Sequence, residues 1–350
     1  MHYHILGIMS GTSLDGVDLA MCHFDYSDKG WQYRIERAHT VHYSEEWRKR
    51  LKHAMQLNGL ELTLLDYELG QYFGQLAKEF IRDCGIRPDF ISSHGHTIFH
   101  RPSQGYTLQI GKGSAIAALT KQPVVCDFRS LDVQLGGQGA PLVPIGDALL
   151  FSDYDFCLNL GGISNISFDM MGERQAFDIC PANMPLNELA SQLHLPYDAD
   201  GAMARKGKVH SSLLHTLNDL SFYKHEPPKS LGKEWYDHEF YPLLKASGHS
   251  PEDLLASTVE HIAIQIGQVL QGWRGKMLIT GGGAWNSYLI ERLQDHTEVE
   301  CVVPDAHTVN FKEALIFAFL GLLRWHVQTN TLSSVTGANT DSIGGAIYWH

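Results

Sequence analysis

The stretch from Gly7 to Asp18, which reads GIMSGTSLDGVD, is the feature around which the fold of this chain is predicted. Apolar residues from Tyr3 to Met9 predict a short buried strand, and the alternation that starts at Val17 predicts a second strand. The glycines, hydroxyl groups and carboxylate between them predict a tight turn. The P-loop and the dinucleotide-binding fingerprint both lead into a helix, so this strand–turn–strand stretch matches neither of them.

The composition of this turn suits a phosphate group. Glycines let main-chain N–H groups approach a ligand closely, hydroxyl groups add donors, and the carboxylate of Asp15 can hold a hydrated Mg²⁺ ion. An ordinary hairpin turn explains the same composition equally well. The turn is therefore a candidate phosphate-binding loop, with the hairpin as the alternative.

Composition and charge limit the classes of partner. The chain has 350 residues, 44% hydrophobic and 19% charged, which indicates a globular protein of about two domains. A net charge of -12 without a dense basic run argues against binding nucleic acid or an anionic membrane. The longest helical apolar run, Ala314–Leu323, is too short to span a bilayer, and the N-terminus lacks a signal segment. Six scattered cysteines indicate free thiols, so we expect a soluble cytoplasmic protein.

The glycine-rich hairpin pattern occurs a second time in the chain. Phe156–Leu160 and Ile163–Phe168 predict two strands, and Gly161-Gly162 predicts the turn between them. A duplicated α/β domain explains the repeat; coincidence is the alternative, since Gly-Gly turns are common. Between the hairpins, the glycines and prolines of Leu135–Pro144 predict a rigid loop or hinge.

Asp178 is the candidate general base. The residues Ala176–Asp178 predict a strand that ends at this carboxylate, and a turn with Pro181 follows. A carboxylate there can take a proton during phosphoryl transfer. Because a helix is predicted next, a helix-capping role is the alternative.

Further on, Gly281–Gly283 lies between a strand and a helix and predicts either a flat wall for a planar ring or a tight connector.

Other polar residues follow predicted strands or open helices. His94 and His96 are interpreted as sugar-binding or packing residues rather than a zinc site, since no Asp or Glu accompanies them within the local loop. Arg129 is either an anion clamp or a surface ion-pair member. Glu313, at the head of a helix expected over 311–325, is either a first-turn dipole partner or a substrate contact. Ser13 does not fit a nucleophile elbow.

Several longer motifs carry a resemblance over nearly the whole chain. They are Ser10–Asp18, Ser93–Thr97, Asp127–Arg129, Gly136–Pro144, Leu160–Asn165, Gly281–Gly283 and Ser334–Ala338. At these residues the chain closely resembles the anhydro-N-acetylmuramic acid kinase family, within the sugar kinase, actin and chaperone ATPase superfamily. The resemblance implies two related lobes of ribonuclease H-like (actin-like ATPase) α/β fold around a central cleft. Residues 1–130 would form the N-terminal lobe and 131–350 the C-terminal lobe, with the extreme C-terminus packing back on the first lobe.

The resemblance also implies an activity. Enzymes of this family use ATP and Mg²⁺ in cell-wall (peptidoglycan) recycling and are expected to be homodimers. They open the anhydro ring of 1,6-anhydro-N-acetylmuramic acid with water and phosphorylate O6, giving N-acetylmuramic acid 6-phosphate. The residue that matches Asp178 activates the water that attacks the anomeric carbon.

The resemblance further implies ligands for individual residues. ATP would be bound by Gly11, Thr12, Ser13, Leu14, Asp15, Gly16, Val17, Asp18, Gly161, Gly162, Gly281, Gly282 and Gly283. The amino sugar would be bound by His94, His96, Arg129, Asn183 and Glu313. Asp15 would hold Mg²⁺ through water.

The chain departs from the family at two places. The family usually has Asp-Thr-Gly-Pro-Gly-Asn where this chain reads Asp178-Ile179-Cys180-Pro181-Ala182-Asn183. Lost glycines restrict the backbone, so this turn could narrow the approach to substrate. The family also commonly has Gln at His96, whose charge we expect to vary near neutral pH. Three alternatives follow: a kinase of the same fold for another amino sugar, a nucleotide-binding homologue with impaired catalysis, and a His-metal hydrolase.

Overall fold

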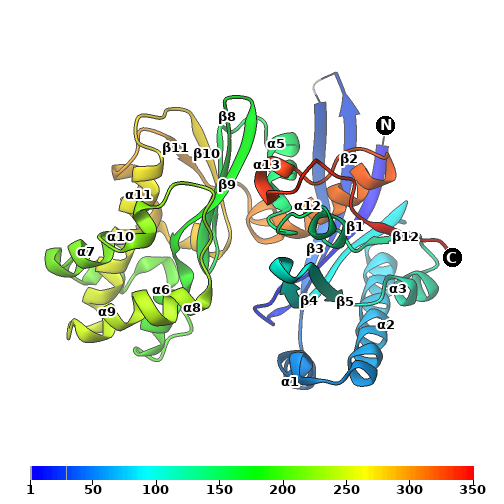
Figure 1. Ribbon diagram of the computed structural model, residues 1–350, viewed down its shortest axis with the longest axis horizontal. Coiled ribbons are helices and arrows are strands. Elements are labelled where there is room, and N and C mark those ends of the chain that lie inside the picture. Colours follow the sequence, from blue (N-terminus) through cyan, green and yellow to red (C-terminus); the bar gives the residue numbers. More distant parts are fainter. Residues whose placement is uncertain (1, 29) are drawn as a thin grey trace. The chain divides into compact units, whose positions relative to one another are not determined.

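The structure, a computed structural model, describes residues 2–28 and 30–350 and has two compact units. Unit 1 ends at Leu150 and resumes over Phe311–His350, and unit 2 is Phe151–Asn310. The boundary between the compact units differs from the lobe boundary at residue 130 that the resemblance implies. Residues 131–150 and 311–350 pack with the N-terminal part of the chain. Each unit is an α/β structure with a sheet of its own (Figure 1).

The sheet of unit 1 has the strand order β12-β6-β4-β1-β2-β3, with β5 paired to β4. Its strands are β1 (His2–Ser10), β2 (Gly16–Ser27), β3 (Gly30–His42), β4 (Phe90–Arg101), β5 (Tyr106–Ile110), β6 (Val124–Cys126) and β12 (Ala346–Tyr348). β1, β2 and β3 form an antiparallel meander, whereas β4 lies parallel to β1 and β6 parallel to β4. The predicted strand–turn–strand at the start of the chain is therefore confirmed.

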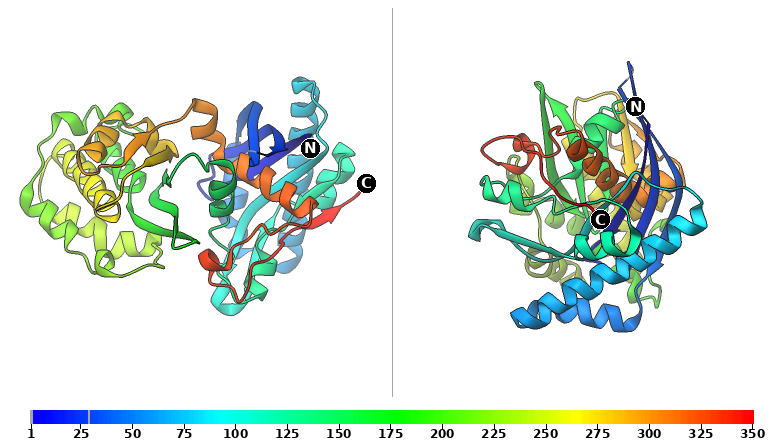
Figure 2. Two further views of the ribbon diagram at one scale, coloured as in Figure 1. Left: turned by 90° about the horizontal axis from the view of Figure 1, so that it is seen from above. Right: turned by 90° about the vertical axis from the view of Figure 1, so that its right-hand side faces the viewer.

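Helices cover both faces of the unit 1 sheet (Figure 2). They are α1 (Glu45–His53), η1 (Ala54–Gln56), α2 (Gly59–Cys84), η2 (Pro102–Gln104), α3 (Gly113–Thr120), α4 (Ser130–Gln134), α5 (Val143–Leu150), α12 (Ala306–Trp325, in unit 1 from Phe311 onward) and α13 (Ser333–Thr336). Apolar residues of α1, α2 and α3 pack with β1 and β2 in one core cluster. Ser44 caps α1 by accepting a hydrogen bond from Trp47 N–H, and Gly85 ends α2 in the left-handed conformation.

The other face of this sheet is covered by α12. Gly7 of β1 faces this helix, and a Cβ atom at Gly7 would overlap the carbonyl oxygen of Ala314, so the close approach requires glycine. The helix has 20 residues and is apolar enough to cross a membrane by length and composition, so the sequence estimate of its length was wrong. Because 72% of its apolar window is buried inside the structure, α12 is a core helix of unit 1.

The sheet of unit 2 repeats the strand order of unit 1. Its order is β11-β10-β7-β8-β9, formed by β7 (Phe156–Leu160), β8 (Ile163–Met170), β9 (Glu173–Pro181), β10 (Lys276–Thr280) and β11 (Glu300–Val302). The first three strands again form an antiparallel meander, and β10 and β11 again add in parallel. This order matches β6-β4-β1-β2-β3 of unit 1, so the predicted pair of related ribonuclease H-like lobes is confirmed.

Helices of unit 2 enclose its core. They are α6 (Asn183–Ser191), η3 (Ala199–Gly201), η4 (Ala204–Lys206), α7 (Ser211–Asn218), η5 (Ser221–Lys224), α8 (Lys233–Trp235), η6 (Tyr236–Phe240), α9 (Tyr241–Ala246), α10 (Pro251–Val269), η7 (Gly282–Trp285) and α11 (Ser287–Asp295). Ser250 caps α10 and Pro251 is its first residue. Apolar residues of α6, α10 and α11 pack with the strands in one cluster, which supports the ends of β7 and β9 where candidate site residues lie.

Candidate active site

The candidate phosphate loop of unit 1 connects β1 to β2. Thr12, Ser13 and Asp15 are exposed in this loop, and Leu14 adopts a positive φ of 62°. At its end, a Cβ atom on Gly16 would overlap the carbonyl oxygen of Val41 in β3, so this position requires glycine. The loop therefore presents its polar groups to solvent while its ends are fixed in the sheet.

Ser10, just before the loop, is held by two buried side chains. Its Oγ lies 2.9 Å from Nδ1 of His96 and 2.7 Å from the hydroxyl oxygen of Tyr43. His96 is 3% exposed, and burial lowers its pKa to about 4. The expectation that its charge varies near neutral pH is therefore wrong: His96 is neutral there and supports the strand that carries the phosphate loop. Its predicted contact with a sugar stays a prediction.

His94 has a different partner. Nε and Nη2 of Arg129 both lie 3.0 Å from Nε2 of His94, whose Nδ1 lies 3.0 Å from the carbonyl oxygen of Gly95. Burial, with the charge of Arg129, holds the pKa of His94 well below its usual range, so neutral Nε2 accepts from the guanidinium. Strand β4 does continue through both histidines, with Gly95 at a φ of 77°. In the described residues, the group of three possible metal ligands does not include either histidine, so their interpretation as sugar-binding or packing residues stays a prediction.

The side chain of Arg129 is half-buried and joins His94 to the glycine-rich loop, so it is not a surface residue, and its role as an anion clamp stays a prediction. Its Nη1 donates to the carbonyl oxygen of Gly139 at 2.6 Å, in the glycine-rich loop that follows α4. Burial lowers its pKa to about 10, and Glu313 opposes this shift, so the guanidinium stays charged at neutral pH. The glycine-rich loop is fixed in turn by Asp132, whose carboxylate accepts from Gly139 N–H and from the Thr336 hydroxyl, each at 2.7 Å. The sequence motifs around 136–144 and 334–338 thus meet at one buried carboxylate.

Asp18 and Glu313 are two further carboxylates of unit 1. Asp18 accepts a hydrogen bond of 2.6 Å from the Thr40 hydroxyl; burial raises its pKa, as does the neighbouring Asp15. Glu313 is exposed, yet desolvation of its carboxyl by the surrounding protein raises its pKa, an effect that Arg129 opposes and Asp18 adds to. Since α12 begins at Ala306, Glu313 lies about two turns into the helix, and its reading as a first-turn dipole partner is wrong.

The second glycine hairpin has main-chain partners in unit 2. The carbonyl oxygen of Gly161 accepts from Asn183 N–H at 3.0 Å, and that of Gly162 accepts from Ala182 N–H at 2.9 Å. Gly162 is exposed. The hairpin turn is therefore fixed against the start of α6 while one of its glycines faces solvent.

Asn183 joins this hairpin to the triple glycine. Its Nδ2 donates to the carbonyl oxygen of Leu160 at 2.7 Å. A Cβ atom on Gly283 would lie 2.7 Å from Leu160 Cβ and 2.9 Å from Asn183 Oδ1, and Gly281 has a φ of 82°. The triple glycine is thus both a tight connector and a wall without side chains, so the two alternatives raised by the sequence are compatible.

Asp178 lies within β9 rather than at its end. It pairs with Asn165 of β8, and the strand continues to Pro181. Its N–H donates to the carbonyl oxygen of Lys229 at 3.1 Å, and its Oδ2 accepts from Leu231 N–H at 2.8 Å. Burial raises the pKa of this half-buried carboxyl, and the Leu231 hydrogen bond opposes the shift. The capping alternative is wrong, because the N-cap of α6 is Ala182, which makes no side-chain cap bond.

Two features near Asp178 were not resolved from the sequence. The first is the segment Lys229–Leu231, which holds the carboxylate and has no local motif for that role, although the preceding Pro227-Pro228 signals a rigid backbone. The altered turn after Asp178 was expected to narrow the approach to substrate. The side chains of Ile179, Cys180 and Ala182 are instead buried in the core of unit 2, with 2%, 0% and 0% exposure.

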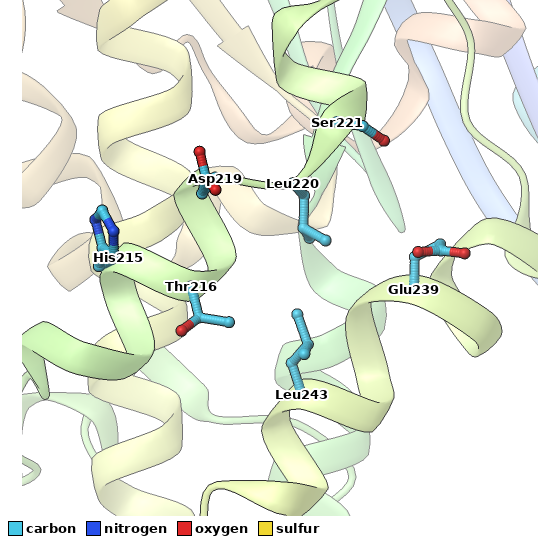
Figure 3. A pocket seen from close by; sticks show the side chains of 7 residues that line it. All are labelled: His215, Thr216, Asp219, Leu220, Ser221, Glu239 and Leu243. Atoms are coloured by element: carbon cyan, nitrogen blue, oxygen red, sulfur yellow. The ribbon is translucent and has the colours of Figure 1, made fainter.

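A surface hollow of ≈ 370 Å³ lies elsewhere in unit 2, between α7, η5 and η6 (Figure 3). His215, Asp219 and Glu239 are among its lining residues. None of its lining residues belongs to the candidate site, so this hollow is not part of that site.

Comparisons with known proteins agree with the resemblance. The profile of the family described as anhydro-N-acetylmuramic acid kinase matches residues 3–350. Proteins with that name are similar to this chain in Bacillus cereus (32% identity, 98% of this chain and 96% of the relative) and in Microcystis aeruginosa (33% identity, 98% and 99%). Among solved structures, a 2-hydroxyisocaproyl-CoA dehydratase activator from Clostridium difficile with bound ADPNP (12% identity, 93% and 97% coverage) gives a TM-score of 0.44. A hexokinase of the ROK family from Thermus thermophilus (12% identity, 92% and 100% coverage) gives 0.41. The profile match and the relatives from Bacillus cereus and Microcystis aeruginosa show that the chain belongs to the anhydro-N-acetylmuramic acid kinase family.

Proposed function

We propose that this chain uses ATP to convert 1,6-anhydro-N-acetylmuramic acid and water into N-acetylmuramic acid 6-phosphate, in the recycling of peptidoglycan. Family membership supports the reaction class, a phosphotransfer to an alcohol. The observation that carries the proposal is the position of Asp178, a half-buried carboxylate held by Leu231 N–H in the same unit as the second glycine hairpin.

Asp178 is the general base in this proposal. Its carboxylate removes a proton from water as the water oxygen bonds to the anomeric carbon and the bond from that carbon to O6 breaks. O6 then takes the γ-phosphoryl group of ATP, ADP leaves, and the proton on Asp178 passes to solvent. Burial raises the pKa of Asp178, which makes its carboxylate a stronger base than an exposed aspartate. The Leu231 hydrogen bond fixes the direction in which the carboxylate points.

Each unit has its own part in the proposed binding of substrates. The loop from Gly11 to Asp18 of unit 1 binds phosphate through main-chain and hydroxyl donors, and so does Gly161-Gly162 of unit 2. The triple glycine at 281–283 lies against adenosine. Arg129 and Glu313 of unit 1 bind the amino sugar, the first through its planar guanidinium.

The carboxylates of unit 1 fit the Mg²⁺ ion that the family implies. Asp15 and Asp18 place two carboxyl groups beside the phosphate loop; burial and, to a smaller extent, Asp15 raise the pKa of Asp18, and carboxylate oxygens are ligands that Mg²⁺ accepts. Asp15, through water, and Asp18 would hold the ion, which neutralises charge on the phosphates when bound.

Localisation and assembly are also proposed. All six cysteines are free, and three of them are buried, which supports a reducing compartment such as the cytoplasm. A homodimer is proposed from family membership alone. The net charge of -12 supports a small-molecule substrate rather than nucleic acid or an anionic membrane surface.

The experiment incubates the protein with ATP and Mg²⁺ and with either 1,6-anhydro-N-acetylmuramic acid or N-acetylglucosamine. We expect ADP only with the anhydro sugar, and a product heavier than that sugar by one water and one phosphoryl group. Turnover of N-acetylglucosamine alone would favour a kinase for another amino sugar. Heat protection by ATP without ADP release from either sugar would indicate an impaired homologue.

A further inference from the structure

Four side chains form a cluster on one face of the unit 1 sheet, and the proposed reaction uses none of them. His2 pairs with Asp25 and His4 pairs with His23 across β1 and β2. Alternate residues of a strand share a face, and so do directly paired residues of neighbouring strands. His2, His4, His23 and Asp25, which together form the histidine cluster, therefore project from the same face of two rigid strands.

Three members of the histidine cluster converge. The ligand atoms of His2, His23 and Asp25 all lie within 4.8 Å of one another. Nδ1 of His2 contacts Oδ1 of Asp25, and Nδ1 of His23 lies 3.4 Å from Oδ2. The two imidazole rings are parallel within 2°, with centroids 6.1 Å apart, so each ring directs a nitrogen toward the same carboxylate.

The His23 ring is packed against its neighbours, whereas the His2 ring is exposed to solvent. The side chain of His23 is 16% exposed, and the His4 ring stacks on it with centroids 4.7 Å apart. Nε2 of His4 lies 3.9 Å from a carboxylate oxygen of Glu36. The side chain of His2 is 80% exposed, so an ion can enter from solvent.

Two imidazole nitrogens and one carboxylate oxygen are a donor set for zinc and similar divalent transition metals, whereas Mg²⁺ prefers oxygen ligands alone. We propose that His2, His23 and Asp25 bind one Zn²⁺ ion. The alternative is a carboxylate that accepts hydrogen bonds from two imidazoles without a metal. Small side-chain movements bring the three atoms to zinc bonding distances, because the strands that carry them are already paired in register.

The site is separate from the proposed reaction. β1 runs from His2 to Ser10, and at about 3.3 Å per residue its two ends are about 26 Å apart. The histidine cluster is thus at the opposite end of β1 from the phosphate loop. A bound ion would link β1 to β2 and so stabilise unit 1. This proposal does not depend on the identity of the substrate.

The test measures metal binding by the full chain purified without a histidine tag and treated with a chelator. Zn²⁺ is titrated by calorimetry, and Co²⁺ by its visible absorption, which reports an ordered ligand set. Because the chain has 20 histidines, a matched control is needed. His39→Gln serves, since His39 is exposed on β3 of the same sheet.

We expect one saturable Zn²⁺ per chain, with affinity reduced by about tenfold or more in His2→Gln and in Asp25→Asn, and unchanged in His39→Gln. Zn²⁺ should also raise the melting temperature of the wild type but not of His2→Gln. His2 is too exposed for its replacement to unfold the protein, so the result is interpretable. Absence of saturable binding, or equal affinity in wild type, His2→Gln and Asp25→Asn, would overturn the proposal.

Discussion

The sheets of unit 1 and unit 2 have the same strand order, but they differ in the turn after the first strand and in the residues of the third strand. In unit 1, the turn between the first two strands is long, with exposed Thr12, Ser13 and Asp15. In unit 2, the corresponding turn is only Gly161-Gly162, and the third strand carries Asp178 instead. The repeated topology thus places a glycine-containing turn after the first strand of each sheet, and the proposed function gives anion and sugar binding to unit 1 and water activation to unit 2.

Replacing Asp178 by Asn is expected to have the largest effect. The amide cannot take a proton from water, so kcat should fall by ~10²–10⁴-fold, while the ATP dissociation constant stays within a factor of about two. Steady-state kinetics and ATP titration of the variant check this. Asp153→Asn, at an exposed position of unit 2, is the matched control and should keep full activity.

The raised pKa of Asp178 adds two expectations. The acid limb of kcat/KM in the wild type should lie above the ordinary aspartate value, because the carboxylate must be ionised to act. A carboxyl whose pKa is raised by folding lowers the free energy of unfolding as pH rises from its ordinary value to the raised one, and the full cost remains at neutral pH, so Asp178→Asn should melt no lower than the wild type there. If Asp178→Asn kept more than about a tenth of the wild-type kcat, Asp178 would not be the general base.

Arg129→Lys tests the sugar-binding part of unit 1. Lysine lacks the fork that reaches both His94 and the carbonyl oxygen of Gly139, and charge-assisted hydrogen bonds contribute about 1.5–3 kcal/mol each. KM for the anhydro sugar should therefore rise ~10–100-fold, with KM for ATP nearly unchanged. The control is Arg82→Lys, whose side chain is 72% exposed in the same unit. An equal rise in both KM values would mean that Arg129 does not act on the sugar.

Gly283→Ala tests the nucleotide part of unit 2. The added methyl group would be 2.7 Å from Leu160 Cβ and 2.9 Å from Asn183 Oδ1, and overpacking of this kind costs about 1–3 kcal/mol. KM for ATP should rise about tenfold while KM for the sugar changes little. Gly59→Ala, where a methyl group meets open space at the start of α2, should leave both unchanged. If Gly283→Ala changed KM for the sugar instead, the assignment of the glycine wall to adenosine would be wrong.

His96→Gln should have the smallest effect on activity and a distinct effect on stability. The folded-state pKa of about 4 lies below the ordinary 6.5, so the unfolded chain binds more protons between these values. The wild type should lose stability as pH falls from 6.5 to 4, by about 1.4 kcal/mol for each unit, and Gln should remove this component while still accepting a hydrogen bond from Ser10. Urea unfolding at several pH values measures the difference. Identical pH slopes for both proteins would contradict this.

Much of the fold could be predicted from local pattern. Both glycine hairpins, the capped helices that follow Ser44 and Ser250, and the strand Lys276–Thr280 have local signals, and the structure has each of them. The continuation of β4 through His94 and His96, with Gly95 at a positive φ, has no such local signal. The return of Phe311–His350 to unit 1 depends on packing between distant segments, which a local pattern does not encode.

The residues of the candidate site were proposed from sequence motifs, and they stay a prediction, whereas their contacts could not be predicted. The sequence motifs contain Asp178, Arg129 and Asn183, and their family pattern implies a role for each. The partners that orient them, such as Leu231 N–H for Asp178, lie far along the chain and have no local signature. Charge states were predicted least well, since the pKa of His96 depends on burial that only the folded structure reveals.

The origin of the oxygen atoms in the product is the most direct test of the account. With wild-type protein, ATP, Mg²⁺ and the anhydro sugar in ¹⁸O-labelled water, early samples should contain one labelled oxygen, at the anomeric hydroxyl group, and none in the phosphate. The label should be absent in Asp178→Asn over the same period, because no product forms. Labelled phosphate, or a phosphorylated sugar that keeps its anhydro ring and has no label, would contradict the proposal that Asp178 directs water to the sugar.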